Sequence, residues 1–261
     1  MLFSWFRRPS TVAVPIVCDD PSQMPIFDFA GTALAEDYAT RRRYVKIVDH
    51  VFTPEECRAL VRFAETGIFD LDDHTERPQG ENAWEQAAVH FGMQEHQKLV
   101  DTSYRNSERI LKFDEAVAKW VYERVKPYVG ELDEIGPGSE WERVVGRADS
   151  QEMWRLVGVN ERLSFLRYGP GHFFKEHCDG HVSLPDGREA RVTLQIYLGS
   201  GSVEGGATRL WSRDKRHWVD VEPIQGRLLV FQHRDVLHSG QKVTRGQKLT
   251  LRSDLMFKIT S

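Results

Sequence analysis

The sequence predicts an α+β protein, mainly β, in which helices come first and an antiparallel jelly-roll sandwich or barrel follows. Two observations predict this fold class. From Arg162 onward, short β-type runs are separated by Gly, Pro, Asp and Asn, with no helical stretch between them. Before them, two segments combine an amphipathic period with helix start signals. The 261 residues are enough for one large domain with its own core.

Residues 1–42 are expected to form an arm that precedes a single domain over residues 43–261. The Arg and Pro residues at 7–9 end the apolar start too early for a signal-peptide core or a membrane span. Residues 1–18 contain no Asp or Glu, which leaves mitochondrial targeting open beside the cytoplasm and the nucleus.

Two helices are expected to support the domain. The run R-Y-V-K-I-V-D-H-V-F alternates like a half-buried strand and leads into the first helix. Thr53 is its predicted N-cap, Pro54 its first residue, and Glu56 is placed to close a capping box. Asp114 caps the second helix, which is expected to stop at Pro127.

Residues 67–110 contain Gly, Pro, Asn and many charges with little periodicity, so irregular structure or a lid is expected there. His74, His90 and His96 lie in this stretch, and none has a carboxylate two residues away in a β-type run. We expect surface histidines rather than metal ligands at these three positions.

The β core is expected over residues 160–261, after helical support over residues 43–150. Its predicted strands are R-L-S-F-L-R-Y, R-V-T-L-Q-I-Y-L, A-T-R-L-W, H-W-V-D-V, G-R-L-L-V-F and K-L-T-L-R-S-D-L-M-F.

The overall charge argues against nucleic acid as a partner. The 35 Lys and Arg residues are balanced by 39 Asp and Glu residues, which gives a net charge of −4. The three cysteines, Cys18, Cys57 and Cys178, have no C-x-x-C spacing, so a reducing compartment such as the cytoplasm is favoured. Nothing in the composition predicts the oligomeric state.

The stretch Y-G-P-G-H-F-F-K-E-H-C-D contains two candidate metal ligands. On a strand, the two-residue period places His177 and Asp179 on one face and Cys178, as a packed thiol, on the other. His238, which follows a buried β-type run, is the candidate third ligand. Two histidines and one carboxylate form the facial triad of non-haem Fe(II) oxygenases.

Two cations follow the third candidate ligand. Strand alternation places Lys248, Thr250 and Arg252 on one face of the last predicted strand. A cation that faces an iron site is suited to a dicarboxylate, because one end chelates the metal and the other pairs with the fixed charge. Which of the two cations makes that pair stays open.

From about residue 44 onward the chain resembles the Fe(II)/2-oxoglutarate-dependent oxygenases of the prolyl 4-hydroxylase-like branch. The pieces that carry the resemblance are T-P-E-E-C, S-Y-R-N-S-E, Y-G-P-G-H-F-F-K-E-H-C-D, G-G-A-T and H-S-G-Q-K-V-T-R-G-Q-K. The resemblance implies a double-stranded β-helix with iron held by His177, Asp179 and His238. It also implies that Lys248 pairs with the distal carboxylate of 2-oxoglutarate and that Tyr168 donates a hydrogen bond to the co-substrate.

The reaction implied by the resemblance is hydroxylation of an unactivated C–H bond with O2, in which 2-oxoglutarate becomes succinate and CO2. Ascorbate would be an optional further cofactor of this reaction. The substrate would be a prolyl or other peptidyl side chain or a small molecule, with no membrane or nucleic-acid partner. Gln195 and Arg209 lie on strands that border the cavity in this family, and with Trp211 they are candidate substrate contacts. Arg252 departs from the family pattern as an additional cation.

Two other functions remain open at this point. The first is a catalytically inactive jelly-roll binding module that keeps the histidines and the aspartate for structural reasons. The second is a zinc hydrolase with the same three ligands, which would leave Lys248 and Arg252 without a role.

Overall fold

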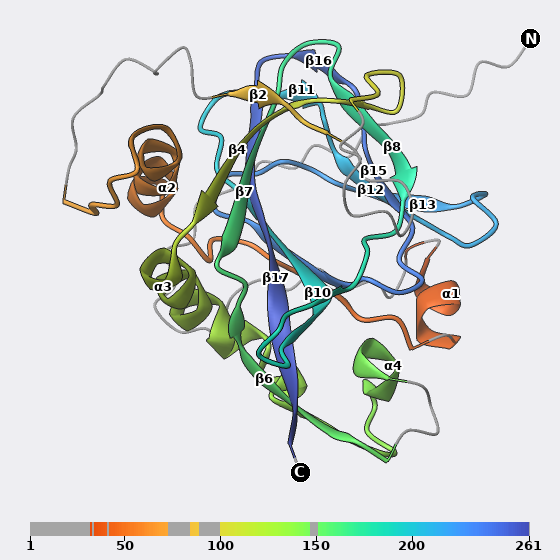
Figure 1. Cartoon of the computed structure of the whole chain (residues 1–261). Helices are drawn as coiled ribbons and strands as arrows, with labels where there is room; N and C mark the ends of the chain where they lie inside the picture. The colour runs from red at the N-terminus through yellow and green to blue at the C-terminus, as the bar shows by residue number, and fades with distance from the viewer. Residues whose placement is uncertain are drawn as a thin grey trace, which may run out of the picture.

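The computed structural model describes residues 32, 34–40, 42–72, 84–88, 100–146 and 151–260. These residues form two antiparallel sheets, and the two supporting helices lie on one side of them. Figure 1 shows the two sheets and the helices around them. The predicted α+β, mainly β class with a jelly-roll core is confirmed. No helix in these described ranges is long and apolar enough to cross a membrane.

The larger sheet has the strand order β1-β14-β10-β17-β7-β4-β2, and β6 pairs with the second half of β17. The strand β5 (Glu134–Ile135) pairs with β6, and β9 (Val182–Ser183) pairs with β10. The main strands are β1 (Val45–Val48), β2 (Glu85–Gln86), β4 (Glu108–Phe113), β6 (Met153–Val159), β7 (Arg162–Tyr168), β10 (Glu189–Tyr197), β14 (Leu228–Gln232) and β17 (Lys248–Thr260).

The smaller sheet has the order β13-β12-β15-β8-β3 and contains two of the three candidate metal ligands. A separate pair of strands, β11 (Glu204–Gly205) and β16 (Val243–Arg245), lies at one end. The strands of the smaller sheet are β3 (Arg105–Asn106), β8 (Phe173–His177), β12 (Thr208–Trp211), β13 (Trp218–Val221) and β15 (His238–Gly240).

The two supporting helices form where the sequence predicts them. In α2 (Pro54–Thr66) the hydroxyl of Thr53 accepts from the Glu56 amide, and the Glu56 carboxylate accepts from the Thr53 amide, which completes the capping box. In α3 (Glu115–Val125) Asp114 accepts from the Val117 amide. Short helices form at α1 (Ala35–Thr40) and α4 (Glu142–Val145), and short 3-10 turns at Lys126–Tyr128 and Gly130–Leu132.

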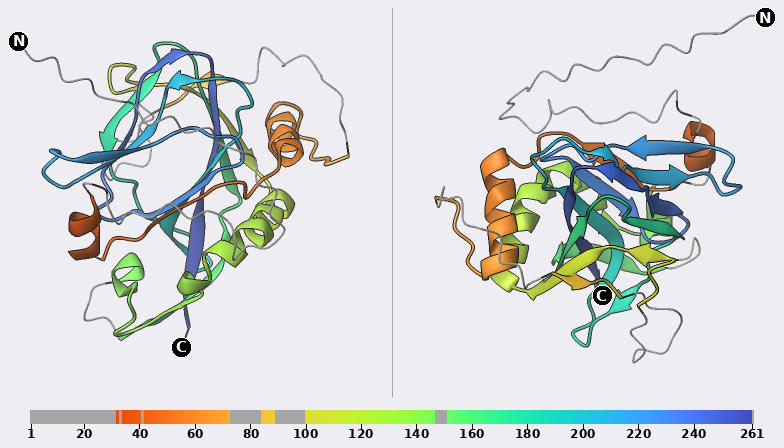
Figure 2. Two further views of the ribbon diagram at one scale, coloured as in Figure 1. Left: turned by 180° about the vertical axis from the view of Figure 1, so that it is seen from behind. Right: turned by 90° about the horizontal axis from the view of Figure 1, so that it is seen from above.

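The main core lies between α2, α3 and the outer face of the larger sheet, as Figure 2 shows from above. Leu60 and Phe63 of α2 and Val121 of α3 are buried against this sheet face. Leu194 and Leu251 are buried on the two central strands that these helices cover. The helices therefore support the larger sheet from outside and leave its other face to the site.

The prediction of irregular structure over residues 67–110 is wrong in part, because β2 and β3 lie within this stretch and β4 begins at Glu108. The strand β4 escapes recognition because its charged residues do not alternate with apolar ones. Pairing with β7 makes this segment a strand, and the Glu108 carboxylate lies 2.7 Å from the Arg167 guanidinium of β7. His74, His90 and His96 lie outside the described residues.

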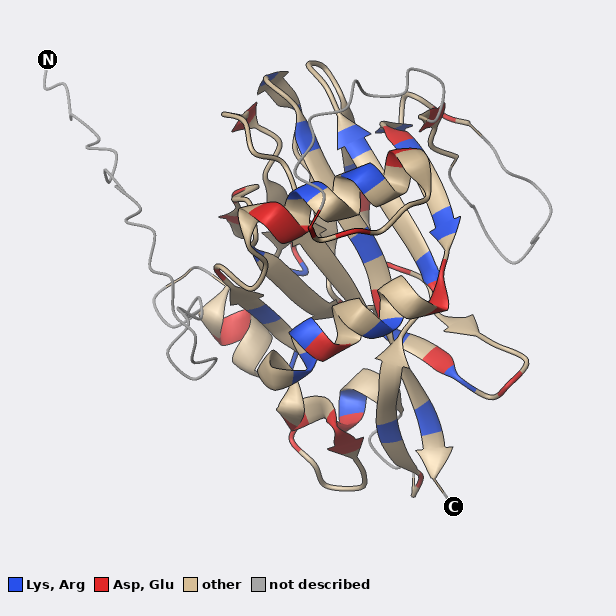
Figure 3. Ribbon diagram, turned by 90° about the vertical axis from the view of Figure 1, so that its left-hand side faces the viewer, with Lys and Arg blue, Asp and Glu red and all other residues tan. Residues whose placement is uncertain are grey.

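Charged residues of both signs are interspersed over the helices and strands in Figure 3, without a large face of one sign in that view. This distribution agrees with the nearly balanced composition. The strand β6 precedes residue 160, where the β core was expected to begin, and belongs to the larger sheet.

Candidate metal centre

The three candidate ligands meet at the end of the smaller sheet. His177 is the last residue of β8, His238 is the first of β15, and the two are paired across these strands. Asp179 lies in the loop two residues after β8 rather than on a strand. One ligand atom from each of the three lies within 4.8 Å of the others. The distances from Asp179 are 3.7 Å to His177 Nε2 and 3.8 Å to His238 Nε2.

Each of the three side chains is oriented by a further hydrogen bond. His177 Nδ1 lies 2.8 Å from the Lys175 carbonyl, and His238 Nδ1 lies 3.1 Å from the Val236 carbonyl. A carbonyl accepts only, so Nδ1 carries the proton and Nε2 has the free lone pair. Thr193 Oγ1 donates to Asp179 Oδ2 at 2.5 Å. Outer hydrogen bonds of this kind are typical of protein metal sites.

The protonation states also suit a cation. Burial, followed by repulsion from His238, lowers the pKa of His177 to about 3, and burial lowers the pKa of His238. Burial alone would raise the pKa of the Asp179 carboxyl, but the charge of Arg252 and the two histidines hold it well below its usual range. Two neutral imidazoles and one carboxylate are the donor set of a facial triad.

Arg252 is held by carboxylates of the protein itself. Its guanidinium lies 3.3 Å from Asp179 and 3.1 Å from Asp254, and Asp254 lies 3.2 Å from His233 Nε2. Burial would lower the pKa of Arg252, but the two carboxylates raise it. Asp254 and His233 were not among the predicted site residues. Continued alternation along β17 would have indicated Asp254, whereas no local pattern indicates His233.

Lys248 lies in different surroundings on the same strand. Its ammonium donates to the Gly206 carbonyl at 2.7 Å and to Thr208 Oγ1 at 3.3 Å, and it lies over the ring of Tyr168. No carboxylate in the described part of the chain is within ion-pair distance of it. Burial lowers its pKa to about 7, with partial compensation from Glu222.

A hydroxyl without a partner lies between these two cations. Thr250 is 1% exposed, and its Oγ1 has no hydrogen-bond partner among the described residues. Strand alternation places it on the face of Lys248 and Arg252. Lys248 and Thr250 together therefore offer a buried ammonium and an unused hydroxyl, which suit one end of a dicarboxylate.

Of the remaining predicted residues, Tyr168 and Gln195 lie on this face. Tyr168 is paired with Lys248 across β7 and β17, and Gln195 is paired with Arg252 across β10 and β17. Gln195 Nε2 donates to Thr208 Oγ1 at 3.0 Å.

Arg209 and Trp211 lie on the opposite face of β12 from the buried Thr208 and Leu210. Arg209 forms a bidentate ion pair with Asp220 and lies over the Trp211 ring. The structure therefore does not bring these two side chains to the face of the triad. The expectation of a packed thiol at Cys178 is wrong, because this residue is exposed in the loop after β8.

The sequence profile of the 2OG-Fe(II) oxygenase superfamily matches residues 163–253, which contain the three candidate ligands, Lys248 and Arg252. No curated protein gives a significant match. Among solved structures, a Pseudomonas putida prolyl-4-hydroxylase is similar, with a TM-score of 0.50, 20% identity and coverage of 87% of this chain and 99% of the other. A Trichoplax adhaerens prolyl hydroxylase has a TM-score of 0.50 and 15% identity, with coverage of 87% and 88%.

These comparisons confirm several predictions. The profile match confirms the resemblance to Fe(II)/2-oxoglutarate-dependent oxygenases and the prediction of an enzyme of this class with Fe(II) and 2-oxoglutarate as metal and co-substrate. The two solved structures confirm the fold, which prolyl hydroxylases share.

Proposed function

We propose that this protein is a hydroxylase that holds Fe(II) with His177, Asp179 and His238 and uses 2-oxoglutarate to hydroxylate an unactivated C–H bond. The observation that carries the proposal is the triad on one wall of the site, with a buried ammonium that has no carboxylate partner in the described chain on the opposite wall. A zinc hydrolase would need only the first of these features.

The two cations of β17 would have separate roles. Lys248 would pair with the distal carboxylate of 2-oxoglutarate, because its present partners are a carbonyl and a hydroxyl. Arg252 would hold Asp179 toward the metal, because its guanidinium already bridges two carboxylates. Tyr168, which borders Lys248, would donate to the same co-substrate. This division supports Lys248 as the co-substrate anchor.

Bound iron and 2-oxoglutarate would supply the oxidation in which the substrate, O2 and 2-oxoglutarate become an alcohol, succinate and CO2. The chain itself would orient the reactants and exclude water. Phe174 stacks on the ring of His177 at 3.7 Å, and Phe231 lies against that of His238 at 4.6 Å. These rings would help to exclude water from the two histidine ligands.

The proposed substrate is a peptidyl side chain such as proline, with a small molecule as the alternative. The Trichoplax structure contains a peptide fragment, which supports the first choice by analogy of fold. Gln195 lies on the site face and is the proposed substrate contact. Arg209 and Trp211 would reach only a substrate that extends over the edge of the smaller sheet. Ascorbate dependence and a cytoplasmic location stay predictions.

The test begins without O2. Metal-free protein mixed with Fe(II) and 2-oxoglutarate should develop a weak visible charge-transfer band, which the His238→Ala variant should lack. The matched control is His217→Ala, because His217 is an exposed histidine outside the site. If the wild-type protein binds both compounds without a band, the proposal fails.

Addition of O2 separates an enzyme from an inactive binding module. The proposed enzyme should form succinate and consume O2, and a peptide or metabolite pool should contain a product heavier by one oxygen atom. A module that only binds would produce no succinate above the level of the His238→Ala variant.

A further inference from the structure

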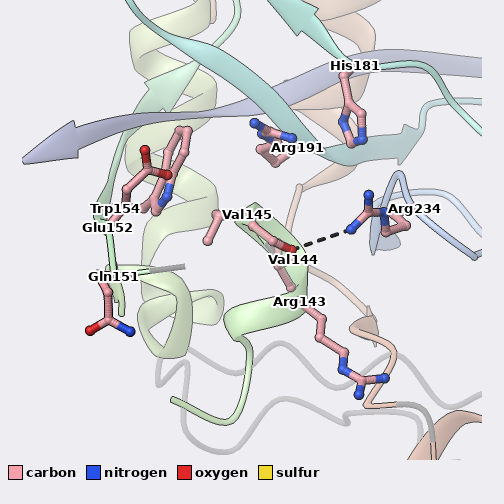
Figure 4. A pocket seen from close by; sticks show the side chains of 10 residues that line it. Arg143, Val144, Val145, Gln151, Glu152, Trp154, His181, Arg191 and Arg234 are labelled. Carbon is pink, nitrogen blue, oxygen red and sulfur yellow. Dashed lines mark hydrogen bonds between the residues drawn. The ribbon is translucent and has the colours of Figure 1, made fainter. Parts of the chain in front are cut away.

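A cavity of about 560 Å³ lies between α4, β6, β10 and the turn that joins β14 to β15. Figure 4 shows the side chains that surround it. Its lining includes Arg143, Trp154, His181, Arg191 and Arg234.

The cavity and the metal centre are built on the same three segments. His181 follows Asp179 by two residues in the loop after β8. Arg191 precedes Thr193, the hydrogen-bond donor to Asp179, by two residues at the start of β10. Arg234 lies in the turn that ends at His238. A group held in the cavity is therefore attached to the same segments as the proposed iron.

The cavity is distinct from the place proposed for 2-oxoglutarate. The ring of His181 lies 5.7 Å from that of His233, which contacts Asp254 and, through it, Arg252. These side chains stand between the cavity and the face where Lys248 lies. A ligand in the cavity would be a second molecule beside the co-substrate.

The charge of the cavity is opposite to that of the whole chain. Arg143 and Arg234 are exposed, and neither has a carboxylate within ion-pair distance among the described residues. Among the described residues, the Arg234 guanidinium makes one hydrogen bond, a long one of 3.5 Å to the Gly146 carbonyl. Arg191 is paired with Glu189, and Glu152 is the acidic residue of the lining. In a protein of net charge −4, this concentration of arginines favours an anion.

Two buried donors in the lining also lack an acceptor within the described ranges. Trp154 is 4% exposed, and its indole N–H has no hydrogen-bond partner among the residues that the structure describes. The same holds for the Nε of Arg191, although its guanidinium lies over the Trp154 ring at 5.1 Å. Buried donors without acceptors are rare and costly, so both indicate a ligand that accepts hydrogen bonds.

We propose that this cavity binds a carboxylate of the hydroxylation substrate, held by Arg143 and Arg234 at the rim and by the donors of Trp154 and Arg191 inside. The proposal rests on the proposed function, because it identifies the substrate of that site as an acidic molecule. A carboxylate fits these residues because it only accepts hydrogen bonds and forms bidentate ion pairs with guanidinium groups. It could be an acidic side chain of a peptide or the free α-carboxylate of an amino acid or peptide.

Three small probes of nearly the same shape test this by saturation-transfer NMR. N-acetylglutamate α-amide has a side-chain carboxylate, N-acetylglutamine has an α-carboxylate, and N-acetylglutamine amide has neither. The full-length protein is loaded with Zn(II), as a diamagnetic substitute for iron, and with 2-oxoglutarate, so that the probes report on the cavity. At least one carboxylate probe should bind, and the neutral probe should bind about tenfold more weakly or not at all.

The variants locate the binding. Arg143→Gln with Arg234→Gln should weaken the carboxylate probe about tenfold or more without affecting the fold, because both side chains are exposed. The control Arg216→Gln removes an exposed arginine elsewhere and should change nothing. Equal binding of the neutral probe, no binding of any probe, or an unchanged affinity in the double variant would overturn the proposal.

The same measurement without Zn(II) and 2-oxoglutarate separates this proposal from the proposed function. If the probes still bind to a protein that gives no charge-transfer band, the anion site is supported and the proposed hydroxylase function fails. Succinate formation by a protein that binds none of the probes would do the reverse.

Discussion

The two ends of the charged face of β17 have the same formal charge and opposite surroundings. At one end Lys248 is buried among a carbonyl, a hydroxyl and aromatic rings, and its pKa is lowered to about 7. At the other end Arg252 lies between two carboxylates, which raise its pKa. The neighbours, rather than the charge, therefore separate a cation that is suited to bind a ligand from one that is suited to hold the protein together.

Removal of Arg252 should have the largest effect on stability. Arg252→Met leaves Asp179 and Asp254 buried without their shared cation, so the free energy of unfolding of the metal-free protein should fall by about 3 kcal/mol. Because bound metal would neutralise Asp179, Zn(II) should restore part of the loss. Denaturant unfolding with and without Zn(II) measures both effects.

The matched control for this prediction is Arg245→Met. The ion pair between Arg245 and Glu204 is exposed on both sides, so its loss should cost about 0.5 kcal/mol or less. Equal losses of unfolding free energy in the two variants would mean that Arg252 does not stabilise the buried Asp179 carboxylate.

Removal of Lys248 should leave the fold intact and weaken the co-substrate. Lys248→Met removes the proposed partner of the distal carboxylate, so the affinity for 2-oxoglutarate should fall by about 100-fold, which is about 2.7 kcal/mol. The stability should change by about 1 kcal/mol or less, because the lost hydrogen bonds to Gly206 and Thr208 are offset by the removal of an ammonium that is buried without a carboxylate partner in the described chain. Titration of the charge-transfer band with 2-oxoglutarate and an unfolding curve test the two parts. If Lys248→Met binds 2-oxoglutarate with unchanged affinity and Arg252→Met binds it more weakly, Arg252 rather than Lys248 is the co-substrate anchor.

The lowered pKa of Lys248 gives the third prediction. Between pH 7 and the unfolded pKa of 10.5, the unfolded state binds more protons, so the stability of the ligand-free protein should rise with pH over this window. Binding of 2-oxoglutarate needs the ammonium form. Its affinity should therefore fall by roughly tenfold from about pH 7 to about 8.5.

Calorimetry measures the linked proton directly. At about pH 8, titration in buffers of different ionisation enthalpy should show an uptake of about one proton per 2-oxoglutarate bound. The Lys248→Met variant should show none. Uptake that persists in the variant would assign the proton to another group.

The sequence was most informative where local rules determine the structure. The cap residues Thr53, Glu56 and Asp114 act within their own helices, and these helices begin as predicted. Alternation along β17 places Lys248 and Arg252 on one face without reference to any other segment. The profile match then adds the oxygenase class, which rests on motifs rather than on local propensity.

The parts that the sequence did not indicate depend on distant pairing. Glu108–Phe113 becomes a strand because β7 lies beside it. The roles of the two cations differ because of their neighbours. Arg252 contacts Asp179, which lies in a loop more than 70 residues earlier in the sequence, whereas Lys248 donates to Gly206 and Thr208. The arginine-lined cavity brings together Trp154, Arg191 and Arg234, which are far apart in the sequence.

The smallest predicted effect lies midway between the two ends of the face. Thr250→Val replaces a buried hydroxyl, which has no hydrogen-bond partner among the described residues, with a methyl group of similar size. The free energy of unfolding should not fall, because no hydrogen bond is lost. If the hydroxyl serves the co-substrate, the affinity for 2-oxoglutarate should still fall about fivefold, which is about 1 kcal/mol. Thr193→Val is the contrasting variant, because its hydroxyl already donates to Asp179 and its loss should weaken metal binding instead. An unchanged 2-oxoglutarate affinity in Thr250→Val would confine the co-substrate contact on β17 to Lys248.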